Sequence, residues 1–405
     1  MPRTTTPRTA ALLLAVPLLL SACSAPGPDA ASAPETAEPH GYIAGAQENS
    51  EPQTGLLTVN AATGEGQLLS LLTGESSAAG TEGPVNAAYR DGRYALMATG
   101  AGVDLFDTGA WTVDHGEHKH YYSAEPGSVG LLQVPDAGAV AGDGTSIAVF
   151  SETGGYAAVY RHKDLDAGNL TESARITTTP HAGVVVPYQG HFLASVATGS
   201  AAANGVEVRD AGDAVVLGRQ DCPGLAGHSA TRAGIVFACS DGALLVRGDG
   251  GTFSGEKIPY PDGGAGRPPA THLEHRPGSN ELAGPAGDAG VWHLDAAKRK
   301  WTFLPTPVPV LAASAVGDGR RVLAAGVDGS LLAMNPATGA LEAQVPLLAP
   351  STPAGAVPRV LVDTSRAYVS DPARSAVHEI DYADGLRVAR SFDVPAADIV
   401  LETGL

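Results

Sequence analysis

Three histidines lie within six residues of one another, in the run Asp114-His115-Gly116-Glu117-His118-Lys119-His120. The chain has 12 histidines in 405 residues, so chance places fewer than one in a window of this length. Neutral imidazole is a good ligand for zinc and also suits copper and nickel. In extended backbone His118 and His120 point the same way, and Gly116 lets the chain fold His115 back toward them. The run predicts a transition-metal site, the alternative being a solvated polar loop.

Zinc takes four ligands in closed tetrahedral sites, so three imidazoles need at least one more group. Asp114, next to the first histidine, is a candidate ligand. Water or a residue from elsewhere in the chain is the other source.

Repeated short strands must position these residues. From Tyr42 onward, runs rich in Val, Ala, Leu, Ile and Tyr alternate with turns such as Asp91-Gly92 and Asp328-Gly329, which is typical of β-hairpins. Units begin near residues 42, 85, 142, 183, 226, 271, 311 and 359. These spacings are roughly 40 to 57 residues, and a four-stranded propeller blade repeats at about 40–50. We therefore predict an all-β fold, a β-propeller of eight blades, with seven as the alternative.

The first unit supplies only three predicted strands, at 42–46, 56–60 and 67–72, and lacks an inner one. The tail at 397–402 is a strand-like run without a unit of its own. We expect this C-terminal strand to complete the first blade and close the ring, which leaves few exposed sheet edges.

Two single histidines lie where blades are expected to begin. His181 precedes the apolar run 184–188, and His228 stands in Gly227-His228-Ser229. Inner strands line the central channel of a propeller, so both residues are candidate metal ligands there. For the other isolated histidines, an ordinary structural role is the better interpretation.

The N-terminal residues are typical of a bacterial export signal. Arg3 and Arg8 precede an apolar run at 10–20, which is too short for a bilayer-spanning helix of about 20 residues. The sequence Leu20-Ser21-Ala22-Cys23 resembles a lipobox and predicts lipidation of Cys23, with free secretion as the alternative. We expect a signal peptide at 1–22, a flexible acidic Ala/Pro tether at 23–40 and the propeller at 41–405.

The two remaining cysteines are Cys222 and Cys239. An oxidising exterior favours a disulfide between them, and thiolate ligation of a metal is the competing interpretation.

Composition excludes several classes of function. The 51 glycines and 30 prolines argue against a helical bundle, and a net charge of −18 repels nucleic acid and anionic lipid. A lipid anchor would then be the one contact with the membrane. The sequence has no Walker-type loop, no His-Glu-x-x-His and no Rossmann glycine motif.

The histidine run within its context, WTVDHGEHKHYY at 111–122, resembles the AztD-type zinc metallochaperones. So do Pro180-His181-Ala182-Gly183-Val184 and Cys222-Pro223 with Ala238-Cys239-Ser240-Asp241-Gly242. The resemblance implies a β-propeller that binds Zn²⁺ outside the cytoplasmic membrane and passes it to the solute-binding protein of a zinc ABC importer. It also implies metal-handling roles for His115, His118 and His120, and a channel site involving His181.

The leading hypothesis is therefore a lipid-anchored, extracytoplasmic zinc chaperone and not an enzyme. The first alternative is a propeller enzyme, either a quinoprotein-like oxidoreductase or a metal-dependent hydrolase that uses the same histidines. The second is a protein-binding propeller without a metal.

Overall fold

The computed structural model describes residues 45–114, 118–199, 202–350 and 357–405. The chain divides into two compact units, Met1–His40 and Gly41–Leu405, and the described residues belong to the second. The signal peptide, the tether and Cys23 lie outside the described residues and stay predictions. No helix in the described ranges has the length and apolar character needed to cross a membrane.

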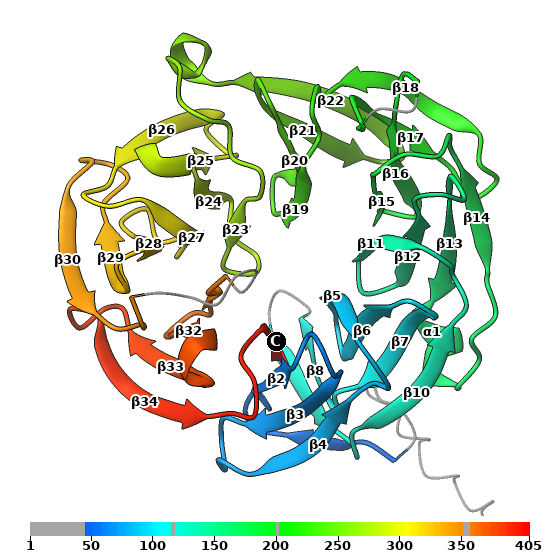
Figure 1. Cartoon of the computed structure of the whole chain (residues 1–405). Helices are drawn as coiled ribbons and strands as arrows, with labels where there is room; N and C mark the ends of the chain where they lie inside the picture. Colours follow the sequence, from blue (N-terminus) through cyan, green and yellow to red (C-terminus); the bar gives the residue numbers. More distant parts are fainter. Residues whose placement is uncertain (1–44, 115–117, 200–201, 351–356) are drawn as a thin grey trace, which may run out of the picture. The chain divides into compact units, whose positions relative to one another are not determined.

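Eight antiparallel sets of four strands follow one another around a ring in the described part of the second unit (Figure 1). Each set of four strands is one blade, and two of the blades form a single eight-stranded sheet through a short parallel pairing of β23 (Glu274–His275) with β27 (Val310–Ala315). The predicted β-propeller and its count of eight blades are confirmed.

Four strands make up each blade, from the innermost to the outermost. Blade 1 comprises β35 (Ile399–Thr403), β2 (Gly55–Val59), β3 (Glu65–Ser70) and β4 (Ser76–Gly80), and blade 2 comprises β5 (Val85–Asp91), β6 (Tyr94–Thr99), β7 (Gly102–Asp107) and β10 (Gly127–Leu132). Blade 3 comprises β11 (Ala137–Gly142), β12 (Ser146–Ser151), β13 (Tyr156–Arg161) and β14 (Ala174–Thr177), and blade 4 comprises β15 (Val185–Tyr188), β16 (His191–Val196), β17 (Gly205–Arg209) and β18 (Val215–Asp221). Blade 5 comprises β19 (Gly227–Thr231), β20 (Gly234–Cys239), β21 (Gly242–Asp249) and β22 (Thr252–Pro259), and blade 6 comprises β23 (Glu274–His275), β24 (Glu281–Pro285), β25 (Gly290–Asp295) and β26 (Lys300–Pro305). Blade 7 comprises β27 (Val310–Ala315), β28 (Val322–Gly326), β29 (Ser330–Met334) and β30 (Leu341–Pro346), and blade 8 comprises β31 (Val360–Val362), β32 (Ala367–Asp371), β33 (Ala376–Asp381) and β34 (Arg387–Asp393). The described helices are short: α1 (His162–Asp166) and three 3₁₀ turns at Pro261–Gly264, Gly287–Ala289 and Pro372–Arg374.

The C-terminal strand closes the ring as predicted. β35 pairs antiparallel with β2, with Leu57 opposite Leu401, so the first blade is built from both ends of the described chain. The composition of the rest of blade 1 differs from the prediction. The described end of the expected strand at 42–46 is not in a strand, and the fourth position is taken by β4, whose sequence SSAAG lacks the apolar alternation that would reveal it.

The core lies between neighbouring blades. Middle strands such as β6 and β25 are buried along their whole length, whereas the outer strand β18 is mostly exposed. Between blades 5 and 6, Trp292 and Trp301 pack around Tyr260, with ring centroids 4.5 Å from it. Strands with both faces buried need continuous apolar sequence, which explains the runs seen in the sequence.

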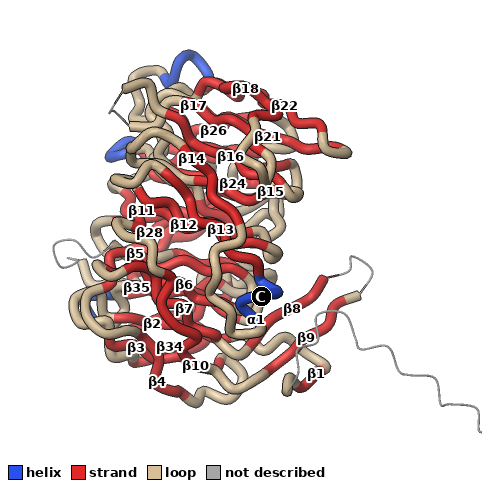
Figure 2. Tube along the Cα trace, turned by 90° about the vertical axis from the view of Figure 1, so that its right-hand side faces the viewer, coloured by secondary structure: helices blue, strands red, loops and turns tan. Residues whose placement is uncertain are grey.

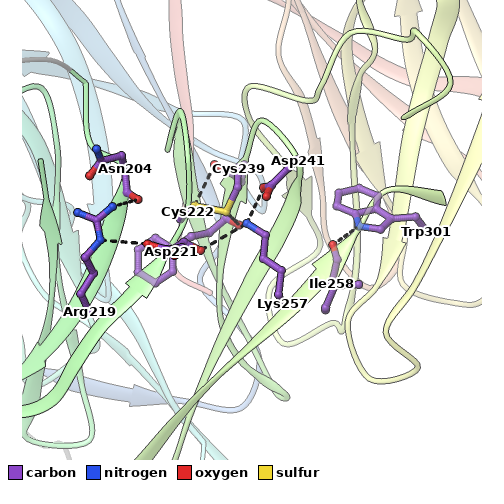
Figure 3. Close-up of a disulfide and its surroundings, with 11 residues drawn as sticks. Asn204, Arg219, Asp221, Cys222, Cys239, Asp241, Lys257, Ile258 and Trp301 are labelled. Carbon is purple, nitrogen blue, oxygen red and sulfur yellow. Dashed lines mark hydrogen bonds and ion pairs between the residues drawn. A yellow bond between two sulfur atoms is a disulfide. The ribbon is translucent and has the colours of Figure 1, made fainter. Parts of the chain in front are cut away.

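A disulfide links Cys222, just after β18, to Cys239 at the end of β20, with an S–S distance of 2.05 Å (Figure 3). The predicted pairing is confirmed. It joins the outer edge of blade 4 to the second strand of blade 5, and both cysteines are buried. In the chain-entropy model a bridge across 17 residues stabilises a fold by about 3 kcal/mol.

Candidate metal site on a hairpin outside the ring

The described part of the predicted histidine run, at 118–120, belongs to a hairpin inserted between the third and fourth strands of blade 2. β8 (Ala110–Asp114) pairs antiparallel with β9 (Lys119–Ser123), and β1 (Gln47–Asn49) adds a third strand beside β9. This three-stranded sheet extends away from the blades (Figure 2). The insertion accounts for the long spacing of the second repeat in the sequence.

The base of the hairpin is anchored by aromatic packing. Trp111 and Tyr122, which lie opposite each other across the two strands, are both buried and stack with centroids 5.4 Å apart. The guanidinium of Arg93 lies 4.4 Å from the Trp111 ring and also pairs with Asp107. The Thr112 hydroxyl donates a hydrogen bond of 2.9 Å to the Gly404 carbonyl. The hairpin therefore leaves the ring from a rigid base.

The imidazoles of His118 and His120 lie together near the tip. His118 is exposed and His120 is half-buried, and their ring centroids are 4.9 Å apart with planes at 77°. Two imidazoles sharing a tetrahedral zinc at about 2.1 Å have centroids roughly 5 Å apart. Centroids at this distance fit two ligands of one zinc ion and also fit the ordinary edge-to-face packing of two rings, so the distance permits a shared ion without requiring one.

The carboxylate of Glu48, on β1, contacts the same site. Its Oε1 lies 2.6 Å from Nδ1 of His120. Sequence reasoning missed Glu48, because a contact between residues 72 positions apart leaves no local signal and a strand of three residues has no periodicity to detect.

Asp114 lies on the opposite face of the hairpin from the two histidines. It faces Lys119 across the strands and forms an ion pair with it at 3.1 Å. The structure does not bring Asp114 together with His118 and His120.

His115 lies outside the described residues, and its role stays a prediction. Among the described residues, no group of three or more His, Cys, Asp or Glu side chains is arranged to hold a metal ion. The described hairpin thus contributes a pair of imidazoles, and further ligands must come from elsewhere.

His181 is buried in the connection between β14 and β15, where both ring nitrogens have protein partners. Nδ1 donates to the Thr179 carbonyl at 2.6 Å, because a carbonyl can only accept. Nε2 lies 2.8 Å from the Ser195 hydroxyl, which also accepts from the backbone N–H of Val184. These contacts give His181 a structural role in positioning the start of β15.

His228 lies on β19 and lines a central cavity of about 800 Å³, together with Glu152, Glu274, Arg359 and Asp398. Burial lowers the pKa of His228 to about 4, so the ring is neutral at physiological pH. His181 is not among the residues that line this cavity, although its neighbours Ala182 and Gly183 are. Of the two predicted channel histidines, His228 thus lines the cavity, whereas His181 uses its ring nitrogens in hydrogen bonds beside it.

The fold is similar to that of two solved proteins. The crystal structure of Citrobacter koseri AztD matches with a TM-score of 0.77 and 20% identity, covering 87% of this chain and 98% of that chain. The structure of apo AztD from the same organism matches with a TM-score of 0.76 and 18% identity, with the same coverage of both chains. The dihydro-heme d1 dehydrogenase NirN, in complex with DHE, matches with a TM-score of 0.57 and 14% identity, covering 88% of this chain and 76% of that chain. No protein-family model and no curated protein sequence matches the chain. The chain therefore has an AztD-type β-propeller fold.

Proposed function

We propose that this chain is an extracytoplasmic zinc metallochaperone that binds Zn²⁺ on the β8–β9 hairpin and delivers it to the solute-binding protein of a zinc ABC importer. The observation that carries the proposal is the pair of imidazoles of His118 and His120 near the end of an anchored hairpin. Their ring centroids lie 4.9 Å apart. The chain acts as a carrier and not as an enzyme.

Exposure of the site favours transfer over permanent storage. A structural zinc site is closed by four protein ligands. Here the exposed His118 stands beside the half-buried His120, and the remaining coordination positions are left to His115, water or a partner's ligand. Zinc held in this way can pass to a partner by exchanging one imidazole at a time. The net charge of −18 also raises the local concentration of cations.

Two further observations support the proposal. The sequence around the histidines resembles that of AztD-type metallochaperones, and the fold is of the AztD type. Because one propeller fold hosts many functions, the histidines of the hairpin favour zinc binding more strongly than the fold does. Anchoring through a lipidated Cys23 would hold the carrier at the outer face of the cytoplasmic membrane, where an importer takes up its substrate.

The test is a transfer experiment with the zinc-loaded full-length protein. The loaded protein is mixed with the metal-free solute-binding protein of a zinc importer from the same organism, and transfer is followed beside release of zinc to an excess of chelator. We expect transfer to the binding protein to be faster than release to the chelator and to saturate with its concentration. Equal rates would mean that zinc simply dissociates, and would contradict delivery through a complex.

A further inference from the structure

Glu48 belongs to a short strand whose pairing partner is the histidine-bearing strand. β1 is three residues long and pairs with β9, with Glu48 opposite Tyr122 and Asn49 opposite Tyr121. The Asn49 side-chain amide adds a hydrogen bond of 2.9 Å to the Ser123 hydroxyl. These contacts fix the position of Glu48 along β9.

The pairing places the Glu48 carboxylate on the same face as His120. Residues two apart on a strand share a face, so His120 and Tyr122 lie on one side of β9, and Glu48 reaches diagonally to the histidine. The His120 ring lies nearly parallel to the Tyr122 ring, with an interplanar angle of 16° and centroids 6.2 Å apart. The centroid of the His118 ring lies 4.9 Å from that of His120. The imidazole is thus oriented by a ring on one side and by a carboxylate at Nδ1.

The 2.6 Å contact determines where the ring proton lies. An ionised carboxylate only accepts hydrogen bonds, so in the neutral imidazole of His120 the proton lies on Nδ1 and the lone pair on Nε2. Metal-ligating histidines almost always donate the proton of their second nitrogen to a carboxylate or carbonyl, which fixes ring orientation and raises ligand basicity.

We propose that Glu48 is a positioning residue for zinc on the hairpin: it holds His120 in the Nδ1–H tautomer, with Nε2 presented as the metal ligand. This inference rests on the proposed function, because the histidine that Glu48 orients belongs to the proposed zinc site. It does not require Glu48 to touch the metal.

The test uses Glu48→Ala, Glu48→Gln and the control Glu51→Ala in the full-length protein. Glu51 is an exposed carboxylate three residues further along, so its removal matches the change in charge. The first readout is the tautomer of His120 in the metal-free protein, from ¹⁵N NMR of labelled histidines. The second is the affinity for Zn²⁺, measured by competition with a chelator.

We expect Glu48→Ala to lose the Nδ1–H tautomer as the dominant form and to weaken zinc binding by about 10- to 100-fold at unchanged stoichiometry. Glu48→Gln keeps an acceptor for the Nδ1 proton, so it should retain the tautomer and recover part of the affinity. Glu51→Ala should behave as wild type. Partial recovery of zinc affinity in Glu48→Gln would show that the loss in Glu48→Ala comes from positioning and not from a folding defect. Glu48→Ala alone does not distinguish the two.

The two proposals fail in different ways. If wild type binds zinc and Glu48→Ala binds it equally tightly, the role of Glu48 is overturned while the zinc function stands. If Glu48→Ala retains the Nδ1–H tautomer, the positioning mechanism is overturned. If wild type itself does not bind zinc, the proposed function is overturned.

Discussion

At the scale of single residues, the histidines differ in whether they lie within the ring of blades or on the inserted hairpin. His181 makes hydrogen bonds through both ring nitrogens and packs edge-on against Phe150, with centroids 5.2 Å apart. His118 and His120 lie outside the ring of blades on an inserted hairpin, where their rings pack edge to face with planes at 77°. The sequence alone does not distinguish these two environments, since both are occupied by histidine and depend on contacts that only the fold creates.

We expect His181→Ala to lower the free energy of unfolding by about 2–3 kcal/mol. The substitution leaves a cavity beside Phe150 and removes the partners of Thr179 and Ser195, which are costs of this order. Urea denaturation measures the loss, and His191→Ala, at a half-buried position, serves as the control. Wild-type stability in the His181 variant would contradict a structural role.

At the scale of elements, the sequence predicts the repeating blades well and the added sheet poorly. Apolar runs separated by glycine turns mark blade strands such as β27 to β30 locally. The sequence reveals the hairpin only as a histidine run. Its anchoring depends on Arg93 and Gly404, and its third strand on β1, and none of these contacts is local in sequence.

Gly404 offers a test of how ring closure is held. Its φ of +79° favours glycine, and a Cβ there would lie 2.1 Å from the Gln53 carbonyl oxygen. Gly339 has a similar φ of +75° with no atom within 4 Å of a Cβ among those considered, so it is a matched control. We expect Gly404→Ala to cost at least about 1 kcal/mol more than Gly339→Ala in urea denaturation. Equal losses would show that the close approach to Gln53 does not constrain the C-terminal strand.

At the scale of the whole molecule, ring closure buries an ionisable group. Glu402, on the closing strand β35, is 5% exposed, and within the described residues its Oε1 has no hydrogen-bond partner. Burial raises its pKa from 4.5 to about 8, with a further rise from the charge of Asp363 and an opposing effect from Arg90. The folded ring therefore favours the protonated carboxyl.

This shift makes stability depend on pH in a definite direction. Between about pH 4.5 and pH 8 the folded state keeps a proton on Glu402 that the unfolded chain releases, so the contribution is complete below pH 4.5 and lost as pH rises through about 8. We expect wild type to lose up to about 1.4 kcal/mol per pH unit across this window relative to Glu402→Gln. Urea denaturation of both proteins at pH 5, 6, 7 and 8 measures the difference. A difference in free energy of unfolding between the two proteins that does not change with pH would contradict the raised pKa of Glu402.

Zinc binding by the imidazoles of the hairpin is tested by the zinc content of the full-length protein. Wild type, His118→Ala/His120→Ala and the control His191→Ala/His378→Ala are saturated with Zn²⁺, freed of excess metal and analysed for zinc per chain. We expect wild type and the control to retain at least one equivalent of zinc per chain, and the hairpin variant to retain one equivalent fewer. Equal zinc content in all three proteins, or no stoichiometric zinc in wild type, would contradict zinc binding by the hairpin.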